Sequence, residues 1–237
     1  MTAILLVSRM ARLRLARGRA RWFCAGAALL PVLLTLGLAA AGKFGGGLVD
    51  EVATLFFRLL VLGLPGFLAA SAVADEMERR TFTFLFTRPV PRSAFVLGQL
   101  VTIFVVVAGL LSVAMALTWG LSWLRSFADA GGDLFHLLRL EAGVIIGTLV
   151  FTAFGLALGL LGRAHAFLIV VLYLLFDVGV GLVPFALRNL SLSWHVGNLA
   201  GLGSADAVSW TVSLAAVSCL TALALLLARV RVRQVEP

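Results

Sequence analysis

The chain has 237 residues, of which 62% are hydrophobic and 13% are charged, and its mean hydropathy is +1.09. A soluble domain of this length carries about 25% charged residues, so the composition excludes an ordinary soluble protein and indicates an integral membrane protein. The net charge of +8 does not indicate a nucleic-acid partner, because the basic residues cluster at the ends of apolar segments and form no basic face.

Residues 1–21 form a basic N-terminal segment that is too charged to span a bilayer. Two interpretations fit this segment: a helix lying on the inner membrane surface with its arginines near anionic headgroups, or a plain basic topology signal. The two cysteines, Cys24 and Cys219, fall inside apolar segments farther along the chain. Both are expected to be buried and to act as small hydrophobic residues.

Six later segments are long enough to cross a bilayer, for which about 20 apolar residues suffice. These predicted spans are 22–41, 52–74, 94–118, 142–161, 166–187 and 207–228. They predict an all-α transmembrane domain over residues 22–228, followed by a basic tail over 229–237. Gly179, Gly181 and Pro184 lie close together in the fifth span and favour a break in that helix.

The distribution of Lys and Arg predicts that both termini lie in the cytoplasm, because positive residues favour that side of a membrane. With this orientation, fourteen of the 19 Lys and Arg residues are cytoplasmic: Arg9, Arg12, Arg14, Arg17, Arg19, Arg21, Arg79, Arg80, Arg88, Arg92, Arg163, Arg229, Arg231 and Arg233. Only Lys43, Arg125, Arg139 and Arg188 lie outside. The outer connections 120–140 and 188–206 mix Trp, Leu and polar residues, which is typical of short helices in the outer interface.

Motifs of catalysis are missing from the sequence. There is no phosphate-binding G-x-x-x-x-G-K-[ST] motif and no His, Cys and carboxylate spacing of a metal site. Ser204 lacks the G-x-S-x-G frame of a nucleophile elbow, and His136, His165 and His195 are far apart in sequence. We therefore expect a chain that is not an enzyme, with no catalytic residue, no metal and no cofactor of its own.

Two charged residues, Arg58 and Asp177, lie inside predicted spans. A carboxylate near the middle of a bilayer costs a few kcal/mol and usually faces protein or water. Asp177 is therefore a candidate substrate or gating contact. The alternative is a protonated or paired Asp177 that joins helices, with Arg58 as its partner unless Arg58 extends toward the membrane surface.

The fourth span carries glycines at four-residue steps, interrupted by Phe151. These glycines are Gly143, Gly147, Gly155 and Gly159. Two G-x-x-x-G pairs allow another helix to approach closely. Both packing within the chain and an interface between subunits are consistent with this pattern.

The connection between the second and third spans is the most charged part of the chain, and we call residues 75–92 the charged connection. It begins with acidic residues, continues with Arg79 and Arg80, and ends at Pro89 and Arg92. Acidic residues before basic residues suit a helix dipole, and the prolines end the helix. Aromatic residues beside these charges indicate either a docking surface or an interfacial helix whose rings enter the lipid.

Several residues here follow one pattern: Glu76 and Glu78, then Thr81 and Leu85, then Arg88-Pro89, Arg92 and Gly98. This pattern resembles the E-x-E-x-G-T-L…L…R-P-[IV]-x-R…L-G-K motif of ABC-2 type transporter permeases. The chain is most similar to the small six-helix permeases, such as those that serve nitrous oxide reductase maturation. Arg80 stands where the motif has Gly, and Gln99 stands where it has Lys. The specific residues are confined to about 74–99 and, weakly, to the "LLFDVG" stretch of the fifth span.

The resemblance implies a permease subunit in a bacterial cytoplasmic (inner) membrane, which forms a homodimer and pairs with two copies of a cytosolic ATPase that binds ATP and Mg. Membrane lipids are further partners, nucleic acid is not, and the expected activity is export of a hydrophobic, lipid-like or peptide substrate. Residues 75–92 would be the coupling helix. Its expected charged contacts to the ATPase are Glu76, Glu78, Arg79 and Arg80, near Thr81, and its anchors are Phe82, Leu85 and Phe86.

The alternative function is a non-ABC membrane protein, either a secondary transporter or a scaffold for membrane assembly. Secondary transporters commonly have several ionisable residues inside the membrane and internal repeats. This chain has one Asp, one Arg and no repeat within its spans.

Overall fold

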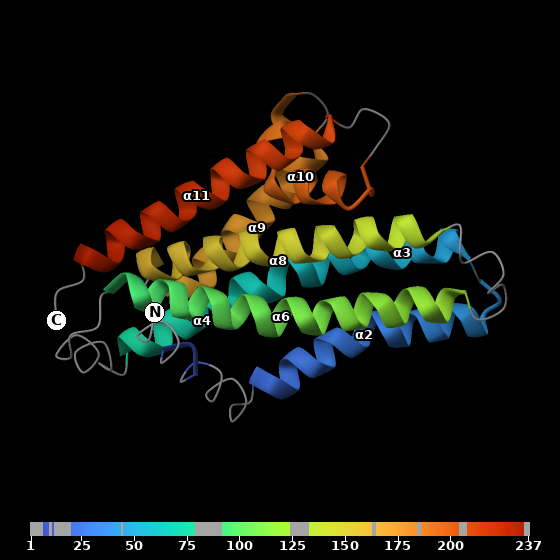
Figure 1. Ribbon diagram of the computed structural model, residues 1–237, viewed down its shortest axis with the longest axis horizontal. Coiled ribbons are helices and arrows are strands. Elements are labelled where there is room, and N and C mark those ends of the chain that lie inside the picture. The colour runs from blue at the N-terminus through green and yellow to red at the C-terminus, as the bar shows by residue number, and fades with distance from the viewer. Residues whose placement is uncertain are drawn as a thin grey trace.

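A computed structural model describes residues 7–9, 11, 20–43, 45–78, 92–123, 133–162, 165–183, 186–203 and 208–234. Within these ranges the chain is all-helical, with eight α-helices and no strand. The elements are α2 (Ala20–Ala40), α3 (Gly46–Phe56), the π-helix η1 (Phe57–Val61), α4 (Leu62–Glu78), α6 (Arg92–Ser122), α8 (Leu134–Gly162), α9 (Ala166–Leu182), the 3-10 helix η4 (Ala186–Leu190), α10 (Leu192–Leu199) and α11 (Trp210–Gln234) (Figure 1).

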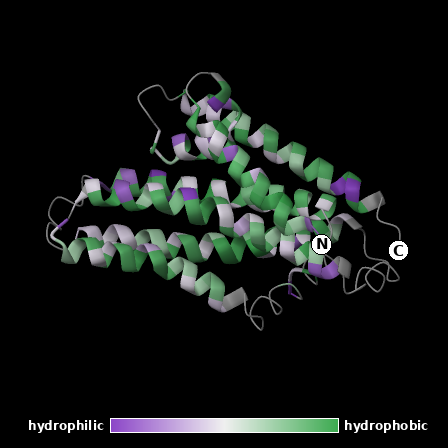
Figure 2. Ribbon diagram, turned by 180° about the vertical axis from the view of Figure 1, so that it is seen from behind, coloured by the Kyte–Doolittle hydropathy of each residue, from purple (hydrophilic) through white to green (hydrophobic). Residues whose placement is uncertain are grey.

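Five helices are long and apolar enough to cross a membrane. They cover Trp22–Ala40, Gly47–Glu76, Ser93–Ser122, Leu134–Gly162 and Trp210–Val232. Each contains most of one predicted span, and hydrophobic residues cover most of its length (Figure 2). These helices indicate a multi-pass membrane protein.

The fifth predicted span, 166–187, forms a shorter element than expected. Its helix α9 has 17 residues and ends at Leu182. The next residue, Val183, has an extended backbone with φ −73° and ψ 127°. A residue before a proline is pushed toward this conformation by the proline ring, and Pro184 follows in the sequence. The 3-10 helix η4 and the helix α10 then form the short helices expected over 188–206.

The outer connection 120–140 does not form a separate short helix in its described part. Residues up to Ser122 belong to α6, and residues from Leu134 belong to α8. The indole N–H groups of Trp119 and Trp123 both donate to Asp133 Oδ2, at 3.2 and 3.1 Å, and so join the end of α6 to the start of α8. Both membrane helices extend beyond their predicted ends at this junction, α6 to Ser122 and α8 from Leu134.

Helix α8 lies at the centre of the bundle and contacts α4, α6, α9, α10 and α11, while α2 packs mainly on α6 (Figure 1). Helix α11 packs through one face that includes Val217, Ala224, Ala228 and Val232, which are spaced for a single helix side. Cys219 lies off this face and is exposed, so its predicted burial is wrong, whereas Cys24 is buried as expected.

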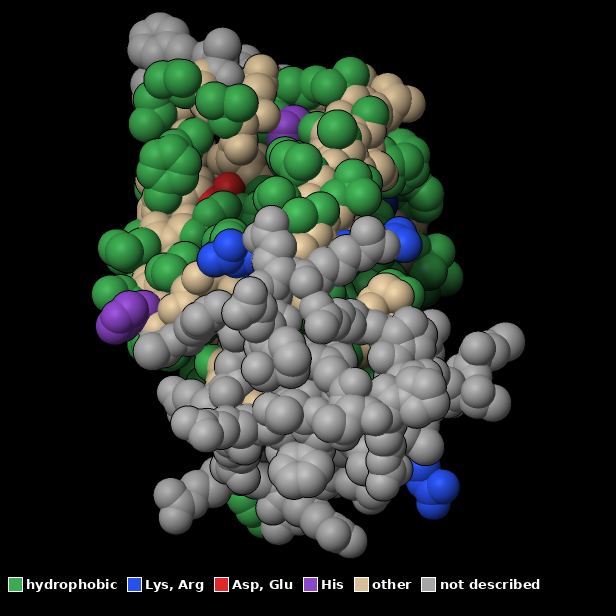
Figure 3. All heavy atoms as spheres, turned by 90° about the vertical axis from the view of Figure 1, so that its left-hand side faces the viewer, with side chains coloured by type: hydrophobic (Ala, Val, Ile, Leu, Met, Phe, Trp, Pro, Cys, Tyr) green, Lys and Arg blue, Asp and Glu red, His purple; other side chains and the backbone are tan. Residues whose placement is uncertain are grey.

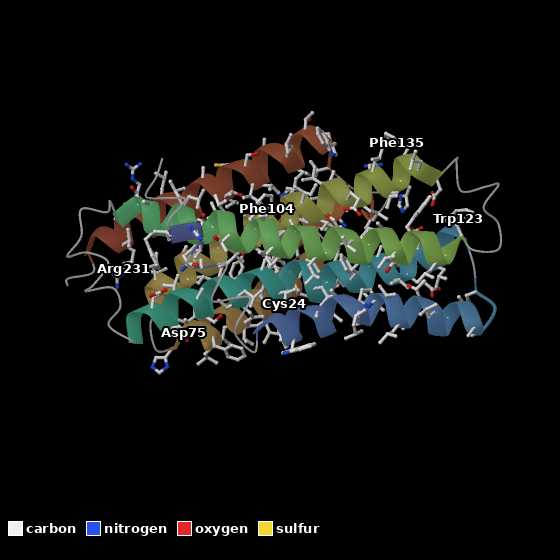
Figure 4. All side chains as sticks on the ribbon, turned by 60° about the horizontal axis from the view of Figure 1, so that its bottom comes forward. Cys24, Asp75, Phe104, Trp123, Phe135 and Arg231 are labelled. Carbon is white, nitrogen blue, oxygen red and sulfur yellow. The ribbon has the colours of Figure 1, made fainter. Side chains whose placement is uncertain are left out.

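Helix α6 begins, and α4 and α11 end, at the same end of the bundle (Figure 1). Asp75 and Arg231 lie toward this end, and Trp123 and Phe135 lie toward the opposite end (Figure 4). Seen from the first end, the described side chains are mainly hydrophobic, with a few Lys and Arg among them (Figure 3). The charged connection therefore joins α4 and α6 at the end of the bundle where α11 also ends.

The four glycines of α8 that the sequence singled out, Gly143, Gly147, Gly155 and Gly159, lie against helices of the same chain. A Cβ on Gly143 would come within 2.5 Å of the Ala200 Cβ, and one on Gly147 would come within 2.6 Å of a Val61 methyl. The other pair faces α4: a Cβ on Gly155 would overlap the Gly66 carbonyl oxygen, and one on Gly159 would lie 2.9 Å from the Ala70 Cα. Close helix packing within the chain accounts for all four positions.

We predict that Gly155→Ala lowers the midpoint of thermal unfolding of the detergent-solubilised protein. Its new methyl group meets the backbone of α4, and such overpacking typically costs about 1–3 kcal/mol. The matched control is Gly109→Ala in α6, where a Cβ meets nothing within 4 Å and helix propensity improves. Equal midpoints for the two variants would contradict the close α4–α8 contact.

Candidate functional site

A π-helical turn interrupts the long helix formed by α3 and α4. This turn, η1, covers Phe57–Val61 and lies just before Pro65 in α4. Pro65 has no N–H group, and a proline ring crowds the carbonyl four residues earlier, which here belongs to Val61. The wider π turn ends at Val61 and relieves this crowding. Such turns occur often at functional sites, and this one contains the exposed Arg58.

The Asp177 carboxylate holds the beginning of α10. Its Oδ1 accepts a hydrogen bond from the Leu192 N–H at 2.7 Å, and its Oδ2 accepts one from the Ser193 N–H at 2.9 Å. Ser191 caps the same helix, because its hydroxyl accepts from the Trp194 N–H at 3.2 Å. The first N–H groups of a helix have no partner within it and carry partial positive charge. Asp177 is 4% exposed and joins α9 to α10 through these groups.

A second set of hydrogen bonds holds α10 against α11. His195 Nε2 lies 2.8 Å from the Asn189 carbonyl oxygen, which can only accept, so this nitrogen donates. His195 Nδ1 then accepts from the Ser213 hydroxyl at 3.2 Å, and Asn198 donates to the same hydroxyl at 2.7 Å. Ser213 is completely buried. These hydrogen bonds fix α10 to α11, and the bonds of Asp177 fix it to α9.

A cavity of about 260 Å³ lies between η1, α8, α9 and α10. Its wall is mostly apolar and includes Phe151, the residue that separates the two glycine pairs of α8. Two arginines also line the cavity, Arg58 from η1 and Arg188 from η4, and the guanidinium carbon of Arg188 lies 5.4 Å from the centre of the Trp194 ring. The cavity thus combines apolar walls with two guanidinium groups.

Of the alternatives that the sequence left open for Asp177, the joining of two helices is observed, but Arg58 is not its partner. Asp177 is buried and bonded to backbone N–H groups of α10, whereas Arg58 is exposed and lines the cavity. No carboxylate of the described residues lies within ion-pair distance of Arg58. The backbone groups satisfy the carboxylate, so it needs no cationic side chain.

Sequence reasoning did not identify Arg188, Trp194, Asn198 or Ser213 as parts of this region. A usable signal was the Ser191-Leu192-Ser193-Trp194 stretch, because Ser is a preferred residue before the first turn of a helix. The position of Arg188 beside Trp194 also follows the common pairing of Arg with aromatic faces. Neither signal shows that α10 folds back against α8.

The residues of the charged connection are described only at its two ends. Asp75 is exposed at the end of α4, and Glu76 is 4% exposed, so the Glu76 side chain belongs to the packed bundle. Glu78 lies in α4 and Arg92 begins α6. Outside the described residues lie Arg79, Arg80, Thr81, Phe82, Leu85, Phe86, Arg88 and Pro89.

We predict that Asp177→Ala lowers the thermal unfolding midpoint more than Asp177→Asn, which keeps one acceptor oxygen. Hydrogen bonds to charged groups contribute about 1.5–3 kcal/mol each, and the alanine variant leaves two N–H groups of α10 without a partner. The control is Glu51→Gln, since Glu51 forms an exposed pair with Lys43 that contributes at most about 1 kcal/mol. A midpoint for Asp177→Ala equal to that of the control would show that the carboxylate does not hold α10.

Comparison with known proteins assigns the chain to a family. No curated protein matches it significantly. Residues 45–233 match a family model described as a protein of unknown function, DUF2705. This match extends from the start of α3 into the last turns of α11 and so includes η1, the charged connection, the glycines of α8 and the α9–α10 junction. The chain therefore belongs to the DUF2705 family, a family of proteins of unknown function.

Proposed function

We propose that this chain is the membrane-spanning permease subunit of an ABC-2 type transporter. In this proposal the five long helices and the shorter α9 make up the six membrane passes. Two permease chains pair with two cytosolic ATPase subunits, which hold ATP and Mg, in a bacterial cytoplasmic membrane. The transporter exports a hydrophobic, lipid-like or peptide substrate.

The observation that carries the proposal is the position of the charged connection relative to α4. The connection bears the Glu76, Glu78, Thr81, Arg88 and Arg92 pattern and follows directly from the end of α4. Helix α4 continues from there through Pro65 to η1, which lines the cavity with Arg58. One continuous helix therefore connects the segment that resembles a coupling helix to a cavity in the bundle.

The packing of α4 supports the transmission of force from this segment. Glu76 is buried in the last full turn of α4, so movement of the adjoining connection displaces the helix. Gly155 and Gly159 of α8 touch the α4 backbone directly, with no side chain between them. Closure of the ATPases on ATP would thus shift α4 along α8 and change the shape of the cavity wall at η1.

The burial of Glu76 also narrows the set of residues that we propose to contact the ATPase. A side chain that is 4% exposed cannot form a large contact with a partner. We assign the docking contacts to Glu78, Arg79, Arg80 and Arg88, and we assign Glu76 to anchoring the end of α4. Phe82, Leu85 and Phe86 remain the proposed anchors of the coupling helix.

We predict that the chain, purified with an affinity tag from its native membrane, retains a protein with a G-x-x-x-x-G-K-[ST] motif in a one-to-one ratio, and that the complex hydrolyses ATP. The double variant Arg79→Glu with Arg80→Glu should reduce retention and ATP turnover at least about tenfold, because like charges then oppose the partner's acidic residues. Mass spectrometry and phosphate release provide the two measurements.

The matched control is Lys43→Glu, which makes the same type of charge reversal between α2 and α3, at the opposite end of the bundle. It should leave retention and turnover unchanged. A secondary transporter or an assembly scaffold would copurify with no ATPase, and that result would refute the proposed function. Equal effects of the control and the double variant would refute the assigned docking residues.

A further inference from the structure

The face of α3 that lines the cavity continues past it to an acidic residue. Asp50, Thr54 and Arg58 follow one another at four-residue steps, which places them on one side of the helix that α3 forms with η1. Thr54 and Arg58 line the cavity, and Asp50 lies one helical turn before Thr54. The Asp50 carboxylate therefore stands just beyond the cavity, toward the end of the bundle opposite the charged connection (Figure 1).

A histidine of another helix reaches this carboxylate. His136, in the first turn of α8, places its Nε2 3.0 Å from Asp50 Oδ1. That nitrogen is enclosed by protein, and the contact lacks the alignment of a regular hydrogen bond. A lone pair on Nε2 would repel the carboxylate, so Nε2 carries a proton in this contact. With a second proton on Nδ1 the ring is positively charged, and the contact becomes an attraction between opposite charges.

The two helices that carry this pair do not pack closely on each other in the described part of the chain. Helix α3 packs on η1, α6 and α2, whereas α8 packs on α4, α6, α9, α10 and α11. The start of α3 is held to α6, because the Gly45 N–H donates to the Ser122 carbonyl oxygen at 3.0 Å. The distance from α3 to α8 at this end therefore depends on the side chains of His136 and Asp50.

The other charged or titratable groups on the described elements around His136 have contacts of their own. Lys43 pairs with Glu51, Asp133 accepts from Trp119 and Trp123, Arg139 lies beside Gly201, Glu141 is hydrogen-bonded to Ser112, and His195 is bonded to Asn189 and Ser213. The described end of α6 carries no charged side chain. Among the residues that the structure describes, Asp50 is the carboxylate at ion-pair distance from His136.

We infer that the pair of His136 and Asp50 is a proton-sensitive clasp at the rim of the cavity. Histidine is the side chain whose charge changes between about pH 5 and 8. At the acid end of this range the charged imidazole attracts the carboxylate and holds α3 toward α8. At the alkaline end the ring is neutral, the attraction weakens, and contacts with α2 and α6 hold this end of α3. The rim of the cavity therefore opens as the pH rises.

The direction in which the clasp acts rests on the proposed function. In that proposal the charged connection contacts a cytosolic ATPase, so the rim at the opposite end of the bundle faces the outside of the cell. A substrate that leaves the cavity for the outside passes the clasp, and the external pH then sets how easily it is released. The clasp itself requires this chain alone.

The first test measures the distance between α3 and α8 in the purified full chain, held in nanodiscs of phosphatidylcholine. Spin labels are attached at Leu55→Cys and Leu138→Cys, since both leucines are exposed on these helices, after Cys24→Ala and Cys219→Ala remove the native thiols. Double electron–electron resonance should give a short, narrow distance distribution at about pH 5.5 and a longer, broader one at about pH 8.5. Identical distributions at the two pH values would overturn the inference.

Matched variants identify the histidine. His136→Ala should give the longer, broader distribution at both pH values, because no cation remains to attract Asp50. Asp50→Asn keeps the size of its side chain and should do the same, so the test stands even if the alanine variant does not fold. His165→Ala removes another histidine, at the start of α9, and should retain the pH dependence. Dependence on pH that persists without His136 or Asp50 would assign the effect to another group.

A second measurement follows access to the cavity at one pH. Thr54→Cys, in the chain without native thiols, places a thiol on the cavity wall. At about pH 6, adding Asp50→Asn should make labelling by a water-soluble maleimide about threefold faster or more. The control is Glu51→Gln, which removes the same charge one residue away and leaves the clasp intact. Equal labelling with Asp50→Asn and with the control would show that the pair does not close the rim.

The outcomes of these measurements are separate from those for the proposed function. Neither measurement contains an ATPase, so their failure leaves the permease proposal standing. A chain that copurifies with no ATPase but shows the expected distances and labelling would refute the permease proposal and retain the clasp.

Discussion

The structure around the cavity depends on the need to pair backbone groups at the start of α10. A buried N–H group without a partner costs about 1–3 kcal/mol, so a helix that begins inside the packed protein requires an acceptor from another element. Asp177 provides two acceptor oxygens from α9, and Ser191 provides a third. A carboxylate that would be unfavourable among apolar side chains is thereby stabilised by the positive end of a helix. This interaction allows α9 to end early and α10 to fold back into the bundle.

The position of α10 explains why the glycines of α8 form two pairs with different partners. Gly143 and Gly147 pack against Ala200, Val196 and the π turn, whereas Gly155 and Gly159 pack against α4. Phe151 stands between the pairs, where a Cβ on Gly66 of α4 would lie 3.6 Å from its carbonyl oxygen, and it is buried and lines the cavity. Tight packing on both sides of Phe151 makes the shape of the cavity sensitive to the position of α4.

Much of the bundle could be predicted from hydropathy, because an uncharged apolar run of about 20 residues has few alternatives to a membrane helix. Prediction was weaker where polar residues continue a helix, as in the first turns of α8, where the run of apolar residues is interrupted by Arg139 and Glu141. Arg58, one of the partners that the sequence suggested for Asp177, is not the partner found, for a different reason. A side-chain partner can be read from a sequence, but the actual partners are backbone N–H groups, which every residue type except proline carries. The π turn could not be predicted either, because Pro65 indicates an interruption of the helix but does not specify which form the interruption takes.

Under the proposed function, α4 links the charged connection at one end to the π turn at the other. Near the charged connection the helix is held by the buried Glu76 and by backbone contact with Gly159. At the other end it passes Pro65 into η1, where a regular ladder of i to i−4 hydrogen bonds is interrupted. Under the proposed function, a displacement that begins at the charged connection would pass along α4 to this turn. Arg58 belongs to the turn and lines the cavity that α10 borders. The proposed coupling would therefore change the cavity wall at η1, while the bonds of Asp177 hold α10 in place.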